Sequence, residues 1–209
     1  VFSAMMAAAP TILRAQGAAR TFKVAMIGSG RRASAAFGNM MDAAKKMGHT
    51  LQLVAAHDYY LEEAQKRCKQ FGCDEKFAFG GGDGYRKLVE MPEIEIVILG
   101  APPAFRPLHL AACIKAGKHV FAEKPVAVDP QGVRHVLECA AAAKEKKLTL
   151  VTGTQRRHQG AYMCQALALQ KGQLGTIRGG NIYWCGGWGS VRPRKPGATN
   201  AQYMTNNWM

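Results

Sequence analysis

Along residues 21–152, short runs of apolar and β-branched residues alternate with longer segments of helical composition. The short runs predict strands at residues 21–27, 51–57, 94–99, 119–122 and 148–152. The longer segments predict helices at residues 31–47, 61–71, 105–116 and 131–147. We interpret the glycine-rich residues 75–84 as a short strand followed by a turn. Strands that alternate with helices predict an α/β fold, a doubly wound parallel sheet with helices on both faces.

The clearest amphipathic helix is predicted over residues 131–147. Asp129 can cap this helix, and Pro130 suits its first turn. Apolar residues at spacings of three and four share one face, which we expect to be buried: Val133, Val136, Leu137 and Ala140.

The pattern changes beyond residue 152. A helix is predicted at residues 159–171 and a strand at residues 177–183. The remainder, from residue 185, is rich in Gly, Pro, Asn and Trp and has little apolar periodicity. We expect residues 21–152 to form one domain and residues 153–209 to be the beginning of a second, α+β domain that is incomplete in this chain.

Residues 1–20 differ from the rest because they are mostly small and apolar. They are similar to the end of the twin-arginine signals of exported bacterial oxidoreductases, although the arginine pair itself is not in this sequence. We expect a leader remnant and a periplasmic or exported protein. The alternative is an ordinary N-terminal helix in a cytoplasmic protein.

Composition narrows the class of partner. Hydrophobic residues make up 48% of the 209 residues, and no apolar run approaches the ~20 residues of a membrane span. The net charge of +14 comes from scattered basic pairs rather than from a nucleic-acid-binding motif. The six cysteines have no zinc-ligand spacing, so no metal site is predicted. We therefore expect no nucleic acid and no membrane among the partners.

The strongest local motif follows the first predicted strand and opens a helix. It reads Gly28, Ser29, Gly30, Arg31, Arg32, Ala33. This is the G-x-G-x-x-[GA] dinucleotide fingerprint of a Rossmann fold in its required context. Gly28 permits the tight turn, Gly30 lets a pyrophosphate approach the backbone, and the helix N-terminus favours negative charge. The alternative is a purely structural turn.

Asp58 closes the second predicted strand, where an acid binds the adenine ribose hydroxyls in this fold. Its carboxylate would repel the 2′-phosphate of NADP, so we expect NAD. NADP stays possible because Arg31 or Arg32 could bind that phosphate. The alternative for Asp58 is an N-cap of the next helix.

The chain resembles the Gfo/Idh/MocA oxidoreductases, which include glucose–fructose oxidoreductase and inositol dehydrogenase. The matching pieces span residues 21 to about 185: VAMIGSG at 24–30, Asp58, ILGAPPAFRPLH at 98–109, AGKHVFAEKP at 116–125 and GTQRRH at 153–158. The resemblance implies that Lys124 lies beside the nicotinamide and the substrate hydroxyl, where a lysine can serve as acid or base. It implies that Glu123 lies near the nicotinamide ribose and that Pro125 fixes a turn. The alternative is a solvated charged turn.

Further cofactor contacts are expected from two loops that follow later strands. Ala101 and Pro102 come directly after the central strand and should line the cofactor cleft, with Arg106 and His109 one helical turn apart. The family more often has His where this chain has Arg106, which we expect to contact a phosphate or ribose.

Gln155 follows the last strand of the domain, where the resemblance implies an approach to the nicotinamide. Arg156 and His158 are candidates for binding a substrate hydroxyl or carboxylate, and the alternative is an ordinary basic loop. Trp184, Trp188 and Trp208 could form a sugar-stacking wall or part of a core. The family's further Asp and His acid/base pair would come after residue 209.

Three functions are consistent with these residues. The first is an NAD(P)-dependent oxidoreductase acting on a sugar, inositol or related polyol, expected to be a homo-oligomer when full length. The second is a glycosidase of the same superfamily that uses bound NAD, although the resemblance implies that those enzymes tend to lack the lysine found here as Lys124. The third is a non-catalytic dinucleotide-binding fragment.

Overall fold

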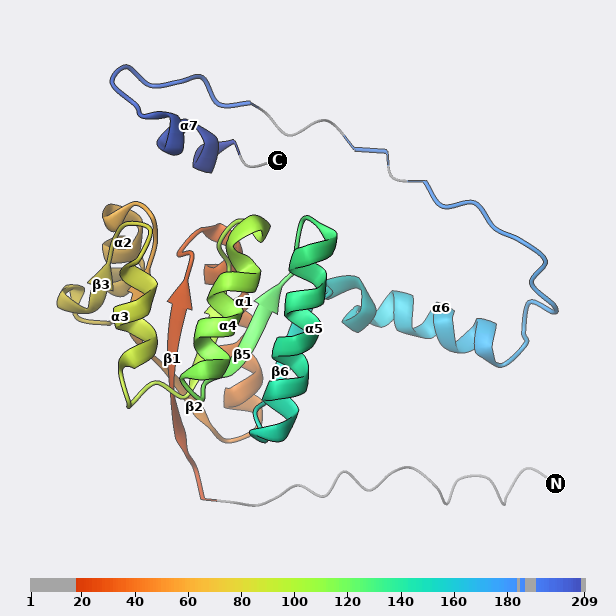
Figure 1. Cartoon of the computed structure of the whole chain (residues 1–209). Coiled ribbons are helices and arrows are strands. Elements are labelled where there is room, and N and C mark those ends of the chain that lie inside the picture. The colour runs from red at the N-terminus through yellow and green to blue at the C-terminus, as the bar shows by residue number, and fades with distance from the viewer. Residues whose placement is uncertain (1–17, 184, 187–190, 208–209) are drawn as a thin grey trace.

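The computed structural model describes residues 18–183, 185–186 and 191–207, and its strands form one six-stranded parallel sheet (Figure 1). The strands lie in the order β3-β2-β1-β4-β5-β6. Their bounds are β1 Thr21–Ile27, β2 Thr50–His57, β3 Ala78–Phe79, β4 Ile96–Leu99, β5 His119–Glu123 and β6 Leu150–Gly153. The sheet grows outward in both directions from β1, so the predicted doubly wound Rossmann fold is confirmed.

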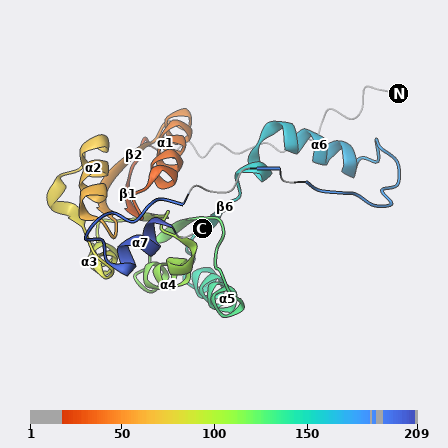
Figure 2. The same ribbon diagram turned by 90° about the horizontal axis from the view of Figure 1, so that it is seen from above.

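Helices cover both faces of the sheet. Figure 2 shows α1 (Arg31–Lys46) and α2 (Leu61–Phe71) on one face, and α3 (Gly84–Glu90), α4 (Arg106–Lys115) and α5 (Pro130–Glu145) on the other. Three short 3-10 turns complete the connections: η1 Glu75–Phe77, η2 Pro103–Phe105 and η3 Gln155–His158. The domain therefore has three layers, with the sheet between two layers of helices. The loops lie at the two ends of the strands.

The core consists of two apolar clusters, one on each face. Successive residues of β1 point to opposite faces because the side-chain period of a strand is two. Val24 and Met26 pack with Phe37 of α1, whereas Ala25 and Ile27 pack in the cluster that contains Leu110 of α4. All of these side chains are buried. β1 is therefore buried on both faces, as expected of a central parallel strand.

The start of α5 is confirmed, but its predicted buried face is partly wrong, because Val136 packs against the core while Val133 and Leu137 are exposed. Asp129 accepts a hydrogen bond from the backbone N of Gly132 at 2.6 Å. The buried residues are Cys139 and Ala143, whereas Leu137 is 64% exposed. The helix packs against α4 with its face rotated by one or two positions, so the small residues face inward.

Beyond β6 the chain forms α6 (Gly160–Gln170) and α7 (Asn200–Asn206). The helix predicted at 159–171 is therefore confirmed as α6. Residues 177–183, predicted as a strand, are irregular, and Ile182 is 99% exposed. A strand needs a neighbour for its backbone hydrogen bonds, and no described segment pairs with these residues.

Tyr60, the N-cap residue of α2, contacts the end of the described chain. The hydroxyl of Tyr60 donates to the backbone O of Gln202 at 2.8 Å and accepts from Asn206 Nδ2 at 3.0 Å. In Figure 1, α7 accordingly lies beyond the arrowhead ends of the strands. The proposed leader up to residue 17 and the three tryptophans Trp184, Trp188 and Trp208 lie outside the described residues. Within the described part, no helix is long and apolar enough to cross a membrane.

Candidate functional site

Most of the residues singled out in the sequence gather at one edge of the sheet. All strands are parallel, so the loops after β1, β2, β4, β5 and β6 leave at the same edge. These loops carry the glycine motif, Asp58, Ala101, Lys124 and Gln155. Ligands of doubly wound sheets bind at this carboxyl edge, where the strand order reverses between β1 and β4.

Gly28 is the point at which three of these loops meet. Its φ of +84° is a left-handed conformation that other residues rarely adopt. Its N–H donates to the backbone O of His57 at 2.8 Å. A Cβ added at Gly28 would lie 2.1 Å from the backbone N of Ala101. Glycine is therefore required here both by the backbone conformation and by the close approach of the β4 loop.

Ser29 is fully buried, and its polar groups bond to β2 and α2. Its N–H donates to Asp58 Oδ2 at 2.8 Å, and its hydroxyl donates to the backbone O of His57 at 3.0 Å. Its carbonyl accepts from Arg67 Nε at 2.7 Å. Ser29, predicted as a cofactor contact, thus has internal partners for its N–H, hydroxyl and carbonyl, and it fixes the loop from within.

The start of α1 is free to bind an anion. Gly30 is the N-cap, and no side chain caps the helix. The first N–H groups of a helix lack acceptors within the helix and carry partial positive charge. A Cβ added at Gly30 would meet no heavy atom within 4 Å. The backbone at Gly30 is therefore open to a phosphate, as the fingerprint requires.

The two arginines of the motif differ in their surroundings. Arg31 is exposed at the first position of α1. Arg32 Nη2 lies 3.0 Å from Glu123 Oε1, although the two residues are 91 positions apart. Since Arg32 pairs with the end of β5, it is directed away from the β2 end where a 2′-phosphate would lie. Of the two, Arg31 is the better placed for such a phosphate.

Asp58 lies directly after β2 and is half-buried. Its Oδ1 accepts from the backbone N of Tyr60 at 3.1 Å, and its Oδ2 accepts from Ser29. Burial raises the pKa of the carboxyl above its usual value, and the hydrogen bonds from Tyr60 and Ser29 partly offset that rise. A carboxylate has about four acceptor positions, so Asp58 can hold this loop and still accept from ribose hydroxyls.

Glu123 and Lys124 lie where β5 ends. Glu123 is 2% exposed and its Oε2, in the described structure, has no hydrogen-bond partner. Gly153 of β6 packs beside it, since an added Cβ would lie 3.0 Å from the Glu123 carboxyl carbon. Lys124 is exposed, and its peptide bond to Pro125 is cis. A buried carboxylate oxygen without a partner fits a ligand hydroxyl, and the exposed ammonium follows it by one residue.

Arg106 holds two of these loops together. It is 3% exposed; its Nη2 donates to the backbone O of Ala101 at 2.6 Å, and its Nη1 donates to the backbone O of Pro125. Burial lowers the pKa of its guanidinium. Arg106 therefore ties the loop after β4, where Pro102 lies, to the turn that carries Lys124. It bonds the protein's own backbone rather than facing outward as a phosphate ligand.

His109 lies in the interior rather than in the cleft. It is 4% exposed, and its ring centroid is 4.5 Å from that of Tyr85 and 6.1 Å from that of His57. Burial lowers the pKa of His109 to about 3, with smaller contributions from the nearby positive charges of His57 and Arg106. The imidazole is neutral at physiological pH and packs under the loops. A direct cofactor contact, as predicted, would need this side chain to leave the core.

The basic loop after β6 forms η3. Gln155, Arg156 and His158 are all exposed there. The guanidinium of Arg156 lies 5.2 Å from the ring centroid of Tyr162 and is also hydrogen-bonded to its hydroxyl. The loop borders the end of β6, which is the neighbour of β5. It is placed on the same side as Lys124.

Two residues that hold the site were missed in the sequence. His57 supplies the carbonyl that binds Gly28 and Ser29, and its Nε2 donates to the backbone O of Gly81 at 2.8 Å. Arg67 bonds Ser29 from α2. The burial of Arg67 could have been predicted, because Arg67 lies on the same face of an amphipathic helix as the buried residues Ala64 and Cys68.

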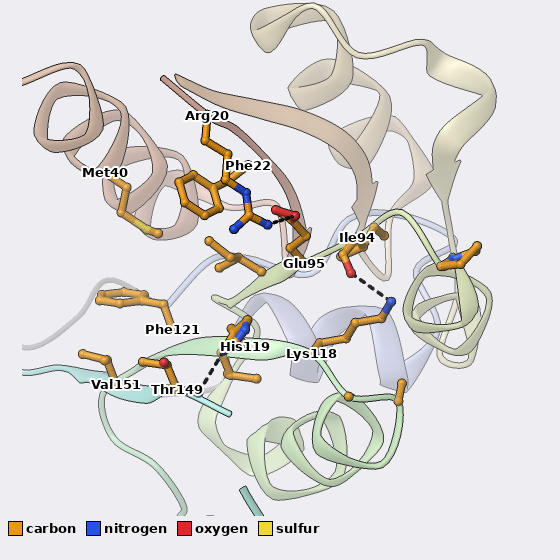
Figure 3. Close-up of a pocket in the computed structure, with 15 residues that line it drawn as sticks. Arg20, Phe22, Met40, Ile94, Glu95, Lys118, His119, Phe121, Thr149 and Val151 are labelled. Atoms are coloured by element: carbon orange, nitrogen blue, oxygen red, sulfur yellow. Dashed lines mark hydrogen bonds and ion pairs between the residues drawn. The ribbon is translucent and has the colours of Figure 1, made fainter. Parts of the chain in front are cut away.

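A cavity of about 730 Å³ opens at the opposite, amino-terminal edge of the sheet. Its lining is drawn in Figure 3. Arg20 pairs there with Glu95 at 2.7 Å, and Lys118 Nζ donates to the backbone O of Ile94 at 2.9 Å and of Met91 at 2.7 Å. These charged groups bond one another or the backbone, and Glu95 Oε2 is buried without a hydrogen-bond partner in the described structure.

This carboxyl edge fits a dinucleotide. Gly30 offers an open backbone at a helix N-terminus, Asp58 offers a carboxylate at the end of β2, and Glu123 offers an unpartnered buried oxygen. The first would hold the pyrophosphate, the second the adenine ribose and the third the nicotinamide ribose. Redox chemistry would be supplied by the nicotinamide.

Known proteins that are similar to this chain belong to the family that its motifs resemble. Inositol 2-dehydrogenase of Pseudomonas syringae pv. syringae is 34% identical over 125 residues, which are 59% of this chain and 35% of that protein. Scyllo-inositol dehydrogenase of Lactobacillus casei has a TM-score of 0.63 at 23% identity, over 76% of this chain and 44% of that one. A 3-ketoreductase of Actinomadura kijaniata, solved with NADP, has a TM-score of 0.60 at 23% identity, over 76% and 46%.

The chain spans about a third of the length of the curated relative. The model of one family, described as an oxidoreductase family with an NAD-binding Rossmann fold, matches residues 22–153, which is more than half of the chain. Together with the carboxyl-edge site, this match shows that the chain belongs to the Gfo/Idh/MocA oxidoreductases.

Proposed function

We propose that the chain is the cofactor-binding part of an NAD(P)-dependent oxidoreductase that acts on a sugar, inositol or related polyol. The observation that carries the proposal is the position of Lys124, exposed at the end of β5 on the same sheet edge as the glycine motif. The inositol 2-dehydrogenase relative supports the substrate class, because it is 34% identical in the matched segment.

The residues have separate roles in this proposal. The nicotinamide would accept a hydride from the carbon that bears the substrate hydroxyl. Lys124 would hold that hydroxyl and take its proton, so that the carbon–oxygen bond becomes a carbonyl. Glu123 would accept from the nicotinamide ribose. Arg106, through its bonds to Ala101 and Pro125, would keep the Lys124 turn against the β4 loop.

NAD is the better-supported cofactor. Asp58 places a carboxylate at the end of β2, and Arg32 is paired with Glu123 instead of facing that end. A 2′-phosphate would therefore meet a negative charge, with the exposed Arg31 as its available partner in the motif. NADP is the alternative, and the affinities for NADH and NADPH compare the two directly.

The test of the activity is a screen of inositols and sugars with the full-length protein, followed by NADH absorbance. We expect NADH to accumulate with a cyclic polyol or sugar. Lys124→Ala should lower kcat by ~10²–10⁴-fold and leave NADH affinity nearly unchanged, because the proton moves only in the transition state. Wild-type kcat in that variant would remove Lys124 from the mechanism.

An NAD-dependent glycosidase is the second candidate, and steady-state kinetics separate the two. A glycosidase of this kind regenerates its NAD⁺ in each turnover, so NADH would not accumulate while the glycoside is cleaved. Lys124 favours the dehydrogenase, since the resemblance associates that lysine with dehydrogenases.

Self-association of the full-length protein belongs to the same proposal. The support is α6, which has no charged residue and exposes Tyr162, Met163, Leu167 and Leu169. An exposed apolar helix of this kind favours burial against another surface. Light scattering of the full-length protein should give the mass of a homo-oligomer, and a monomer mass would contradict it.

A further inference from the structure

A buried arginine contacts the glycine motif from α2. Arg67 is 9% exposed, although arginine is almost never buried unless its charge is paired. Its Nε donates to the backbone O of Ser29 at 2.7 Å, and its Nη1 donates to Gln70 Oε1 at 2.6 Å. Its Nη2 is 3.9 Å from Glu63 Oε2. Two neighbours on α2 therefore orient the guanidinium, and its Nε–H donates to the loop.

The bond to Ser29 fixes the direction of one peptide group. The atoms of a trans peptide lie in one plane, with C=O and N–H pointing in opposite directions. Arg67 holds the carbonyl of Ser29 on the α2 side. The N–H of Gly30, in the same peptide, must therefore point away from Arg67. That N–H opens the set of free N–H groups at the start of α1.

The N–H and the hydroxyl of Ser29 are held from β2, which fixes the residue but leaves the direction of its carbonyl open. The Ser29 N–H is bound to Asp58, and its hydroxyl is bound to the carbonyl of His57. Both partners belong to the end of β2 or the residue after it. Arg67 is the partner that fixes the carbonyl side, and it comes from the helix that follows. Without it, the Ser29–Gly30 peptide could turn and direct its carbonyl oxygen at an anionic ligand.

We propose that Arg67 is a positioning residue that presets the glycine motif to bind the diphosphate of a dinucleotide. The inference rests on the proposed dinucleotide binding and adds to it the residue that orients the phosphate-binding backbone. It predicts that Arg67 affects the affinity for ligands that contain a diphosphate. The affinity for the nucleoside by itself should not change. A purely structural Arg67, stabilising α2 through Glu63 and Gln70, would affect all ligands equally or none.

The experiment compares two ligands on the 209-residue chain. ADP-ribose contains the diphosphate, whereas adenosine has only the nucleoside. Calorimetry gives the affinity for the first, and ligand-observed NMR gives that for the second. Arg67→Met should lower the affinity for ADP-ribose by about 10- to 100-fold, which corresponds to the loss of one hydrogen bond to a charged group. The affinity for adenosine should change by less than about threefold.

Arg134→Met is the matched control, because Arg134 is exposed on α5, which covers the opposite face of the sheet from α2. It removes the same charge and should leave ADP-ribose binding within about twofold of the wild type. Arg67→Lys keeps the charge and can still donate to the Ser29 carbonyl, so it should recover most of the lost affinity. Circular dichroism establishes that each variant is folded. If Arg67→Met is not folded, the ADP-ribose affinity of Arg67→Lys is compared with that of Arg134→Met instead.

Three outcomes would overturn the assignment. They are unchanged ADP-ribose affinity in Arg67→Met, an equal loss for adenosine, and an equal loss in folded Lys and Met variants. Failure of the proposed function looks different, because the wild-type chain would then bind neither ADP-ribose nor NADH. A wild type that binds both, with an Arg67→Met variant that does the same, would reject the role of Arg67 and leave the dinucleotide site standing.

Discussion

At the scale of single residues, the site depends on side chains whose partners come from distant parts of the chain. Glu123 pairs with Arg32, Asp58 with the N–H of Ser29, and Arg106 with two loop carbonyls. The residue types and their order could be predicted from the motifs. These pairings could not, because they depend on how the loops meet at the sheet edge. The same holds for the burial of His109, which depends on Tyr85 from α3.

Replacing Asp58 with Ala should change cofactor selectivity. The variant removes a carboxylate at the expected position of the adenine ribose, so NADH affinity should fall by about tenfold, one lost hydrogen bond to a charged group. NADPH affinity should fall less or rise, because the repulsion of its 2′-phosphate is removed as well. Fluorescence titration of both cofactors measures the ratio. An unchanged NADH-to-NADPH ratio would contradict the role assigned to Asp58.

His109 should make the protein sensitive to acid. Its pKa is about 3 in the folded state and 6.5 in the unfolded chain, so the unfolded chain binds a proton first as the pH falls. The stability that the neutral imidazole contributes is present above pH 6.5 and is lost as the pH falls towards 3, at about 1.4 kcal/mol per pH unit. Urea unfolding between pH 7 and pH 4 measures this slope.

The matched variant for this measurement is His109→Phe, which keeps a ring beside Tyr85 and cannot be protonated. Its free energy of unfolding should fall less steeply over the same pH range. Parallel curves for the wild type and the variant would mean that His109 does not titrate in the unfolding equilibrium.

At the scale of elements, strands were easier to predict than the faces of helices. Ile96–Leu99 and His119–Glu123 lie within or near the predicted ranges because a continuous apolar run indicates a buried parallel strand. The predicted inner face of α5 was partly wrong, because spacing alone leaves a rotation of one or two positions open. Residues 177–183 have strand composition but no pairing neighbour in the described structure.

The cap of α5 gives a test at this scale. Asp129→Ala removes the oxygen that accepts from Gly132 at 2.6 Å. The free energy of unfolding should fall by about 1 kcal/mol, the usual contribution of an N-cap. Denaturant unfolding measures it, with Asp42→Ala in the middle of α1, an exposed position, as the control. Cofactor affinity should not change, and an equal effect in both variants would count against the cap.

At the scale of the whole molecule, the core of the described chain lies within the sheet and its five covering helices. Both apolar clusters are built from residues between Val24 and Leu150. Residues 18–159 should therefore unfold cooperatively on their own, with a midpoint in urea close to that of the 209-residue chain. The fragment should also bind NADH within about threefold of the complete chain. A broad, non-cooperative transition would show that later segments complete the core.

The AGKHVFAEKP segment joins the two edges of the sheet through one strand. Lys118 anchors its beginning to the carbonyls of Met91 and Ile94 at the amino-terminal edge, and Lys124 follows its end at the opposite edge. The length of β5 sets the distance between them, since each strand residue advances the chain by about 3.3 Å. Deleting one residue would move Lys124 by that distance and turn the following side chains to the other face. The distance between the two lysines is thus set by the length of β5. Substitutions within β5 preserve this distance, whereas an insertion or deletion changes it.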